Sequence, residues 1–233
     1  MKKLLEIAVF SPEGAIIAAE AGADRIELCS GYAEGGLTPS SGAVKMAKAN
    51  GDVPVFVMVR PRAGDFFYRC TEIEVMRHDI AEFKTLGADG IVLGILNDDF
   101  SVNEKVLTEF VQLAAPLPVT FHRAFDLCYD PFAALETLIR CGVKRVLTSG
   151  QKSSAQEGAS LLKELQQKAN GRITILAGAG VTPANIVEIA EQTGCHEFHA
   201  SAKRIVPSGD SFGFGENVLP HPELIAQLKE KLL

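Results

Sequence analysis

The sequence predicts a single (β/α)8 barrel, of the TIM-barrel class, that spans residues 1–233. Short apolar segments of strand type alternate with segments of helix type, which is typical of a parallel sheet covered by helices. The strand starts are about 20 to 35 residues apart, as a barrel of eight strand–helix units requires. Polar residues end nearly every predicted strand. A doubly wound open sheet is the alternative, and we favour the barrel because it gathers all strand ends around one pocket.

The length and composition fit one domain with one large core. The chain has 233 residues, of which 47% are hydrophobic, and no linker or low-complexity segment divides it. Its net charge is −6 without a run of Lys or Arg, which argues against nucleic acid as a partner. No apolar stretch is long enough to span a bilayer, and the N-terminal segment lacks the features of a signal peptide. We therefore expect neither a nucleic-acid nor a membrane partner.

The cysteines favour a cytoplasmic location. The chain has five of them, an odd number, and no two form a Cys-x-x-Cys pair. Secreted proteins use paired cysteines as a disulfide framework, whereas free thiols suit a reducing compartment.

The first four strands are expected at residues 4–9, 25–29, 55–60 and 90–94. Ser11 followed by Pro12 is an N-cap pattern that begins the first helix, and Gly22 marks its end. Thr38-Pro39 begins the second helix in the same way. The next two helices are expected at about residues 72–86 and at residues 102–114.

The last four strands are expected at residues 119–122, 145–148, 173–177 and 197–199. Asp130-Pro131 and Thr182-Pro183 begin two of the following helices. The others are expected at residues 155–169 and 222–232. The strand 119–122 ends in His122 and Arg123, an ending that suits a barrel strand delivering side chains to a pocket at its C-terminal end.

Alternation along the strands predicts which side chains point into the barrel. The apolar positions of strand 4–9 face the helices, so its other positions face the interior. The phase of strand 55–60 stays open, although Arg60 ends it. The same reasoning for the other strands gives an inward set, which is Leu4, Glu6, Ala8, Arg25, Glu27, Cys29, Thr120, His122, Glu197, His199 and Ser201.

One pocket would thus collect Glu6, Glu27, Arg60, His122 and His199. Barrel interiors are normally filled with branched apolar residues, and a buried charge is costly unless it is paired. We interpret Glu6, Glu27 and His122, with Asp126 at the rim, as candidate acid and base groups. The alternative is a Glu–Arg network that only fixes packing, because structural ion pairs also bury charges.

An anion-binding role is expected for a second group of residues. Arg60, Arg62 and Arg123 could hold a carboxylate or phosphate. Small residues end the last three strands and expose backbone N–H groups, which in this fold often bind phosphate. The candidates are Ser149, Gly150, Gly178, Gly180, His199 and Ser201. Tight turns are the other explanation for the glycines.

Several motifs resemble the CutC copper homeostasis family. They are Leu5-Glu6-Ile7, Ala23-Asp24-Arg25-Ile26-Glu27-Leu28-Cys29, Glu34-Gly35-Gly36-Leu37-Thr38-Pro39-Ser40, Arg60-Pro61-Arg62-Ala63-Gly64-Asp65-Phe66, Pro118-Val119-Thr120-Phe121-His122-Arg123-Ala124-Phe125-Asp126 and Arg145-Val146-Leu147-Thr148-Ser149-Gly150. The resemblance covers nearly the whole chain. It implies a cytoplasmic TIM-barrel protein, usually oligomeric, that is associated with copper handling and proposed to bind Cu(I).

One position departs from the family pattern. Members often carry Cys directly after the first Leu-Glu-Ile, and this chain has Ala8 there. Cu(I) prefers thiolate and thioether ligands, with imidazole also suitable. Cys29 is then the candidate copper ligand, and His122, His199 and Met58 could approach it. The alternative for Cys29 is a small residue that only packs near the barrel mouth.

Two functions therefore stay open. One is copper binding in the cytoplasm, which the resemblance favours. The other is an enzyme that acts on a small anionic substrate by acid–base chemistry, which the number of charged groups favours. A third hypothesis is a hard divalent metal bound by Glu6, Glu27 and His122.

We also expect a homo-oligomer, with a dimer as the first guess. The loop 208–215 carries Phe212 and Phe214, which have no evident place in the barrel core. Exposed aromatic residues in one patch usually bind a partner. The alternative is that both rings cover the barrel as a lid.

Overall fold

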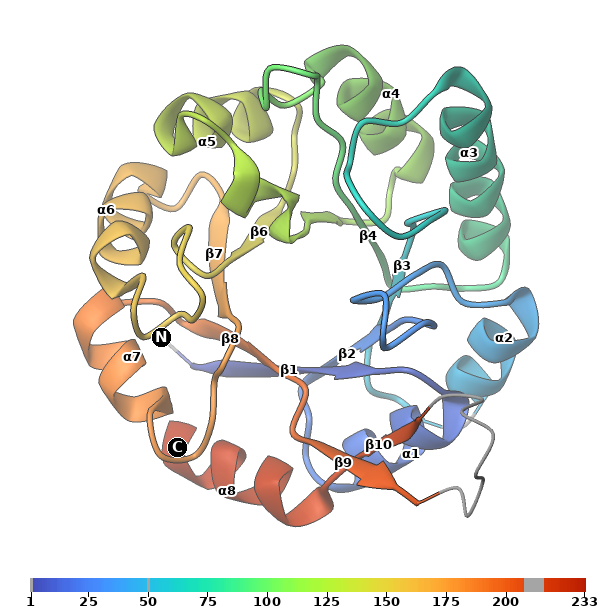
Figure 1. Cartoon of the computed structure of the whole chain (residues 1–233). Helices are drawn as coiled ribbons and strands as arrows, with labels where there is room; N and C mark the ends of the chain where they lie inside the picture. Colours follow the sequence, from blue (N-terminus) through green and yellow to red (C-terminus); the bar gives the residue numbers. More distant parts are fainter. Residues whose placement is uncertain (1, 50, 208–215) are drawn as a thin grey trace.

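The computed structural model describes residues 2–49, 51–207 and 216–233. Strands β1 to β8 pair in sequence order, all parallel, and β8 closes on β1 to form a barrel (Figure 1). This confirms the predicted (β/α)8 barrel and excludes an open sheet. The strands are β1 (Leu4–Val9), β2 (Arg25–Leu28), β3 (Val55–Met58), β4 (Gly90–Leu93), β5 (Val119–Phe121), β6 (Arg145–Thr148), β7 (Thr174–Gly178) and β8 (Glu197–Ala200).

Within the described residues, eight α-helices surround the barrel (Figure 1). Two helix caps expected from the sequence are present. The Ser11 side chain accepts a hydrogen bond from the N–H of Gly14, and the Asp130 side chain accepts from the N–H groups of Phe132 and Ala133. The helices are α1 (Pro12–Glu20), α2 (Ser41–Ala49), α3 (Cys70–Thr85), α4 (Glu104–Ala114), α5 (Pro131–Arg140), α6 (Ala159–Ala169), α7 (Ile186–Thr193) and α8 (Pro222–Leu232), and a short 3-10 helix, η1 (Arg123–Leu127), follows β5.

The large apolar core lies between the strands and the helices. Leu5, Ile7 and Val9 of β1 are buried in it, so Glu6 and Ala8 face the interior, as the alternation predicted. A separate small cluster of Cys29, Phe56, Met58 and Val92 fills part of the interior. It settles the phase of β3, because Phe56 and Met58 point inward while Val55, Val57 and Val59 belong to the outer core.

Two predicted helix starts are wrong by a few residues. Thr38 lies in a loop, where its Oγ1 accepts a hydrogen bond from the N–H of Arg60 at 2.9 Å, and α2 begins at Ser41. The segment after Thr182 is a turn in which the Asn185 side chain bonds the N–H of Thr182 and the carbonyl of Gly180. Both Thr-Pro pairs therefore lie in loops that are held by hydrogen bonds at the ends of the strands, and the helices start after these loops.

Residues 155–158, expected in the sixth helix, also form part of a loop. A Cβ on Gly158 would lie 1.9 Å from the carbonyl oxygen of Ser149, so the chain folds back tightly there and α6 begins only at Ala159.

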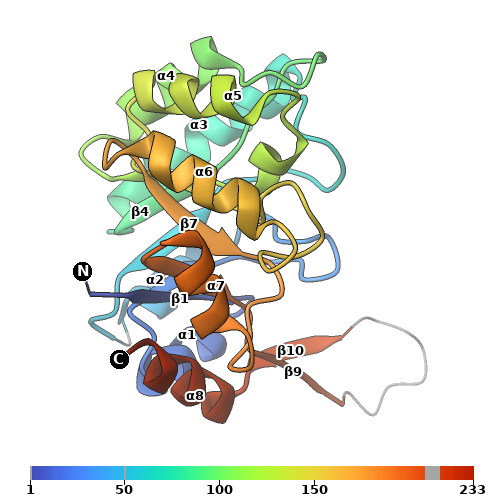
Figure 2. The same ribbon diagram turned by 90° about the vertical axis from the view of Figure 1, so that its left-hand side faces the viewer.

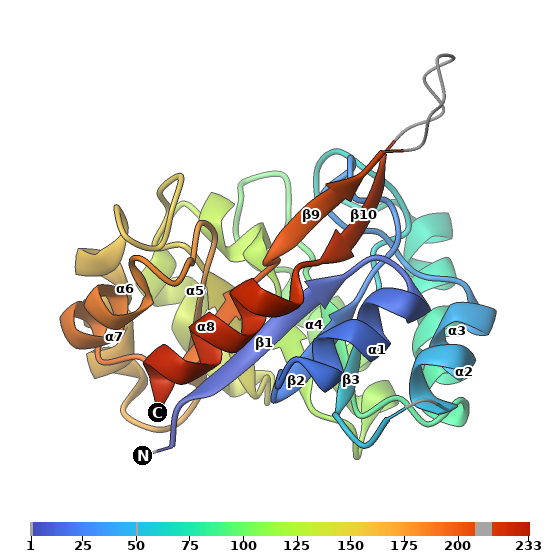
Figure 3. The same cartoon turned by 90° about the horizontal axis from the view of Figure 1, so that it is seen from below.

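A hairpin absent from the prediction follows β8. Strands β9 (Lys203–Val206) and β10 (Asn217–Pro220) are antiparallel, and each is too short to give a clear periodic signal. The hairpin lies at the end of the barrel away from both termini (Figures 2 and 3). The loop 208–215, expected as a lid or an interface, lies outside the described residues.

Candidate functional site

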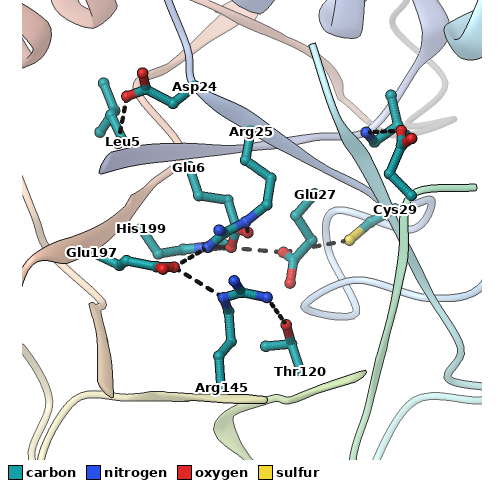
Figure 4. Close-up of polar contacts among 12 residues, drawn as sticks. Leu5, Glu6, Asp24, Arg25, Glu27, Cys29, Thr120, Arg145, Glu197 and His199 are labelled. Atoms are coloured by element: carbon teal, nitrogen blue, oxygen red, sulfur yellow. Dashed lines mark hydrogen bonds and ion pairs between the residues drawn. The ribbon is translucent and has the colours of Figure 1, made fainter. Parts of the chain in front are cut away.

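Four charged side chains form an ion-pair network inside the barrel (Figure 4). The Arg25 guanidinium from β2 contacts Glu6 of β1 through Nε and Glu197 of β8 through Nη2, the latter at 2.6 Å. The Arg145 guanidinium from β6 reaches the same Glu197 oxygen at 2.9 Å. Two carboxylates and two guanidinium groups thus pair across four strands, as the packing interpretation of a Glu–Arg network expected.

The ring of Phe56 supports this network. The guanidinium carbons of Arg25 and Arg145 lie 5.0 Å and 5.1 Å from its centroid, within the range of a cation–π interaction. A Cβ on Gly90 would lie 2.4 Å from the same ring. The strand β4 therefore needs glycine at this inward position to accommodate Phe56.

Glu6 also connects the network to His199 and Glu27. Its second oxygen, Oε1, lies 2.8 Å from Nδ1 of His199. Nε2 of His199 lies 3.7 Å from Oε2 of Glu27, and the Cys29 thiol is 3.7 Å from the same oxygen. Three potential metal-ligand atoms therefore lie within 4.8 Å of one another, one each from Glu6, Glu27 and His199. Figure 4 shows Glu27 between His199 and Cys29.

The pKa values in this group follow from burial and charge. Burial alone would raise the pKa of Glu6, but the charges of Arg25 and His199 outweigh it and lower this pKa to about 2. Glu27 has no such guanidinium partner, and burial raises its pKa. Burial, reinforced by the adjacent Glu27 carboxylate, also raises the pKa of the Cys29 thiol. Burial alone would lower the pKa of His199, but Glu27 and Glu6 raise it. The ionised form is therefore stabilised at Glu6 and His199 and disfavoured at Glu27 and Cys29.

A cavity of about 430 Å³ opens next to these residues. Glu27, Cys29 and His199 line it at the barrel end. The loops after β7 and β8 also line it, with Gly180, Ser201 and Lys203. Arg123 lines it as well. The cavity therefore joins the buried acid–base groups to the loops expected to bind an anion.

Two of the predicted anion-binding glycines have packing reasons. A Cβ on Gly178 would lie 2.4 Å from Leu147 Cδ1, and one on Gly150 would lie 2.3 Å from the carbonyl oxygen of Gly158. Both glycines thus allow close approach of neighbouring chain segments.

Hydrogen bonds of Asp126 and Ser149 connect η1 to the end of β6. Oδ1 of Asp126 accepts from Thr148 Oγ1 at 2.5 Å, and Oδ2 accepts from Ser149 Oγ at 2.9 Å. Arg123 donates to Asp126 at 2.8 Å and to Ser149 at 3.0 Å. The carboxylate predicted as a rim acid or base is therefore saturated with protein donors.

His122 does not lie with the Glu6–Glu27–His199 group. Its Nδ1 accepts from the N–H of Ala124 at 3.1 Å, and its ring packs against Phe66 with 4.8 Å between centroids. Its Nε2 is buried without a partner among the described residues. Burial, with a smaller contribution from Arg60, lowers the pKa of His122 to about 3. His122 therefore makes no hydrogen bond or ion pair with Glu6, Glu27 or His199.

Arg60 and Arg62 are engaged by the loops around them. Arg60 donates to the carbonyls of Glu34, Gly36 and Gly64 at 2.7 to 3.0 Å. Arg62 pairs with Glu72 and Asp65, 2.5 Å and 2.9 Å away. Both guanidinium groups hold loop structure, so Arg123 and Lys203 are the cations that reach the cavity.

Sequence reasoning missed Arg145, the second cation of the network. The available signal was its position two residues before Leu147, on the same face of β6. Val146 is buried in the outer core, which sends Arg145 and Leu147 inward.

Comparisons with known proteins agree on one family. The model of the CutC family matches residues 3–204. A human protein named copper homeostasis protein cutC homolog is 51% identical over 209 residues, which are 90% of this chain and 77% of that protein. A CutC family protein of Chromobacterium violaceum is 48% identical over 208 residues, covering 89% of this chain and 84% of the relative.

Solved structures agree with this result. The crystal structure titled a putative copper homeostasis protein CutC, from Streptococcus agalactiae, has a TM-score of 0.81 and 32% identity, and covers 85% of this chain and 98% of that one. An aldolase with 15% identity and a TM-score of 0.65, covering 86% and 91%, shows the shared barrel fold alone. On this sequence and structural evidence, the chain belongs to the CutC family of copper homeostasis proteins.

Proposed function

We propose that this chain is a cytoplasmic copper homeostasis protein that binds Cu(I) through the thiolate of Cys29. The observation that carries the proposal is the position of this thiol in the cavity wall, next to Glu27 and His199. The other cysteines are placed elsewhere. Cys128, Cys141 and Cys195 are buried in the outer core, and Cys70 is exposed at the start of α3.

Other soft donors are near Cys29. Met58 shares its interior cluster, and both side chains flank Gly36, whose added Cβ would lie 3.3 Å from Cys29 Sγ and 3.8 Å from Met58 Cε. His199 presents Nε2 toward the same Glu27 oxygen that the thiol approaches. Thiolate, thioether and imidazole are donors that Cu(I) accepts. The residues present therefore fit Cu(I), although Ala8 supplies no second thiol.

The cytoplasmic part of the proposal is supported by the thiols. All five cysteines are free, as a reducing compartment allows. None of the described helices is both long and apolar enough to cross a membrane.

A competition titration with Cu(I) under reducing conditions tests the copper proposal. We expect a one-to-one complex of the wild type that Cys29→Ser abolishes, because serine offers no thiolate. Cys70→Ser and Cys141→Ser are matched controls that should leave the complex intact. Equal affinity of the wild type and Cys29→Ser would contradict the proposal.

A second candidate is an enzyme that acts on a small anionic substrate. It is supported by the pairing of Glu27 with His199 at the cavity wall, 3.7 Å apart. Glu6 accepts from Nδ1 of His199, which leaves Nε2 directed toward Glu27 and the ligand space. A carboxyl group and an imidazole so placed could exchange a proton with a bound substrate.

Thermal melts with and without ligands test this candidate. Glu27→Gln should weaken ligand-induced stabilisation while the melting temperature without ligand changes little. His122→Ala provides the comparison, because His122 lies away from the Glu27–His199 pair. A failure of Glu27→Gln to fold would show that Glu27 serves the packing of the barrel instead.

A further inference from the structure

One carboxyl oxygen of Glu27 is unpaired within the described parts of the chain. Its Oε1 is buried and makes no hydrogen bond with the described residues, and the residue as a whole is 4% exposed. Its other oxygen faces His199 and Cys29. Buried carboxyl oxygens are normally hydrogen-bonded, because leaving one unsatisfied is costly. Glu27 lines the cavity, and a rotation of its carboxyl group would turn this oxygen toward a hydrogen-bond donor of a ligand there.

The part of the cavity lining after β7 has the reverse character. The backbone N–H groups of Ala179, Gly180 and Val181 make no hydrogen bond with the described part of the chain. Ala179 and Gly180 both have positive φ, 77° and 69°, and backbone held in this way can present successive N–H groups to an anion. This end of the cavity is therefore rich in donors.

Two cations line the same space. Lys203 contacts the hydroxyl and ring of Tyr32 and has no carboxylate partner among the described residues. Arg123 uses Nε and Nη2 on Asp126 and Ser149, and its Nη1 has no partner in the described ranges. Both side chains keep donor capacity toward the cavity.

We propose that the cavity binds a small hydroxylated phosphate or carboxylate, with its hydroxyl group on Glu27 and its anionic group at the 179–181 loop. The inference rests on the second candidate function and names its ligand class. A molecule that carries both groups matches both parts of the lining, because its hydroxyl can donate to Glu27 and its anionic group can accept from the N–H groups and cations. A volume of about 430 Å³ admits a molecule of this size.

Calorimetric titration of the full chain without added metal tests the ligand class. The probes are glycerol 3-phosphate, D-glycerate, inorganic phosphate and glycerol. We expect the better of the first two to bind at least about tenfold more tightly than phosphate or glycerol, as one additional well-placed hydrogen bond allows. The comparison of glycerol 3-phosphate with D-glycerate identifies which anionic group the loop prefers.

Single-residue variants test which part of the ligand each side of the site contacts. Glu27→Gln should reduce the affinity for the preferred hydroxylated anion about tenfold and leave that for inorganic phosphate unchanged. Lys203→Gln should weaken the binding of all three anionic probes, glycerol 3-phosphate, D-glycerate and inorganic phosphate. Lys105→Gln, on the exposed face of α4, changes the net charge equally and should have no effect.

Three results would overturn the inference. They are no binding of any anion, equal affinity for glycerol 3-phosphate, D-glycerate and phosphate, and equal effects of Lys203→Gln and Lys105→Gln. Binding of these probes without turnover supports the ligand class and does not decide the enzymatic function, which depends on the true substrate. Anion titration without metal and Cu(I) titration without anion are separate measurements, so the anion proposal and the copper proposal can each fail while the other stands.

Discussion

His122 keeps Nε2 buried without a partner among the described residues, and Nδ1 accepts from a backbone N–H. At the barrel mouth, Glu27 and Cys29 are likewise buried beside each other with raised pKa values. At the scale of single residues, burial thus decides which groups carry charge. Two predictions follow from this effect.

The stability of the protein should fall in mild acid because of His122. Its pKa is about 3 in the folded chain and about 6.5 when unfolded. Between these values the unfolded chain binds more protons, so folding loses stability as pH falls. Between about pH 6.5 and 5, His122 alone should lower the free energy of unfolding by ~2 kcal/mol. Urea unfolding should show this loss for the wild type and a smaller one for His122→Gln; equal losses would contradict the assignment.

Cu(I) affinity should decrease as pH falls. Burial and Glu27 keep the Cys29 thiol protonated at neutral pH, so formation of the thiolate complex releases one proton. The affinity should therefore drop about tenfold for each unit of lowered pH. Competition titrations at several pH values measure the slope, and a pH-independent affinity would argue against thiolate ligation.

At the scale of elements, glycines on β4 and the loop after it determine how closely neighbouring strands place large side chains. Gly90 admits Phe56, and Gly94 admits His122. Neither glycine needs positive φ. Their role is clearance, which a strand pattern read by itself does not reveal.

Gly94→Ala should destabilise the fold. The added Cβ would lie 2.4 Å from His122 Cε1 and 2.8 Å from Ala124 Cβ, and overpacking of this kind costs about 1–3 kcal/mol. Gly42→Ala on the exposed side of α2 is the control. It meets only Ser40 Oγ, at 3.8 Å, and should stabilise the helix by up to ~1 kcal/mol. Chemical denaturation of both variants measures the difference in sign; destabilisation by both would contradict this account.

At the scale of the whole molecule, the ion-pair network spans the seam where β8 closes on β1. Glu197 opposes Leu4 in that pairing, and His199 opposes Glu6. Arg25 and Arg145 connect β2 and β6 to the Glu197 carboxylate of β8. The charges therefore link strands that are far apart in the sequence.

Arg25→Met should destabilise the barrel by about 3–5 kcal/mol, because it leaves the fully buried Glu6 without its guanidinium. Arg172→Met removes an exposed pair with Glu136 and should cost less than ~1 kcal/mol. Urea unfolding compares the two. Similar small losses for both would show that the interior pairs contribute no more than surface ones.

The homo-oligomer remains a proposal, with a dimer as the first guess. The aromatic residues that suggested it, Phe212 and Phe214, lie outside the described residues. The adjoining hairpin exposes Ile205 by 54%, which supports an interface at this end of the molecule. Light scattering at high concentration tests it, and a monomer throughout would eliminate it.

The sequence by itself determined the barrel, its strand order and most inward-facing residues. Alternation and cap patterns are local, and parallel strands of one barrel end at the same rim. Glu6, Glu27 and His199 could therefore be predicted to meet. The helix starts predicted at Thr38 and Thr182 were wrong, because a Thr-Pro pair can form part of a hydrogen-bonded loop as readily as it begins a helix.

The tertiary structure alone decided which predicted residues share a site. His122 turns to Ala124 and Phe66, Arg60 turns to three loop carbonyls, and Asp126 is saturated by Thr148 and Ser149. These partners come from loops and neighbouring strands whose approach no single segment encodes. The alternation of a strand gives the direction of a side chain, whereas its hydrogen-bond partners depend on how distant segments pack.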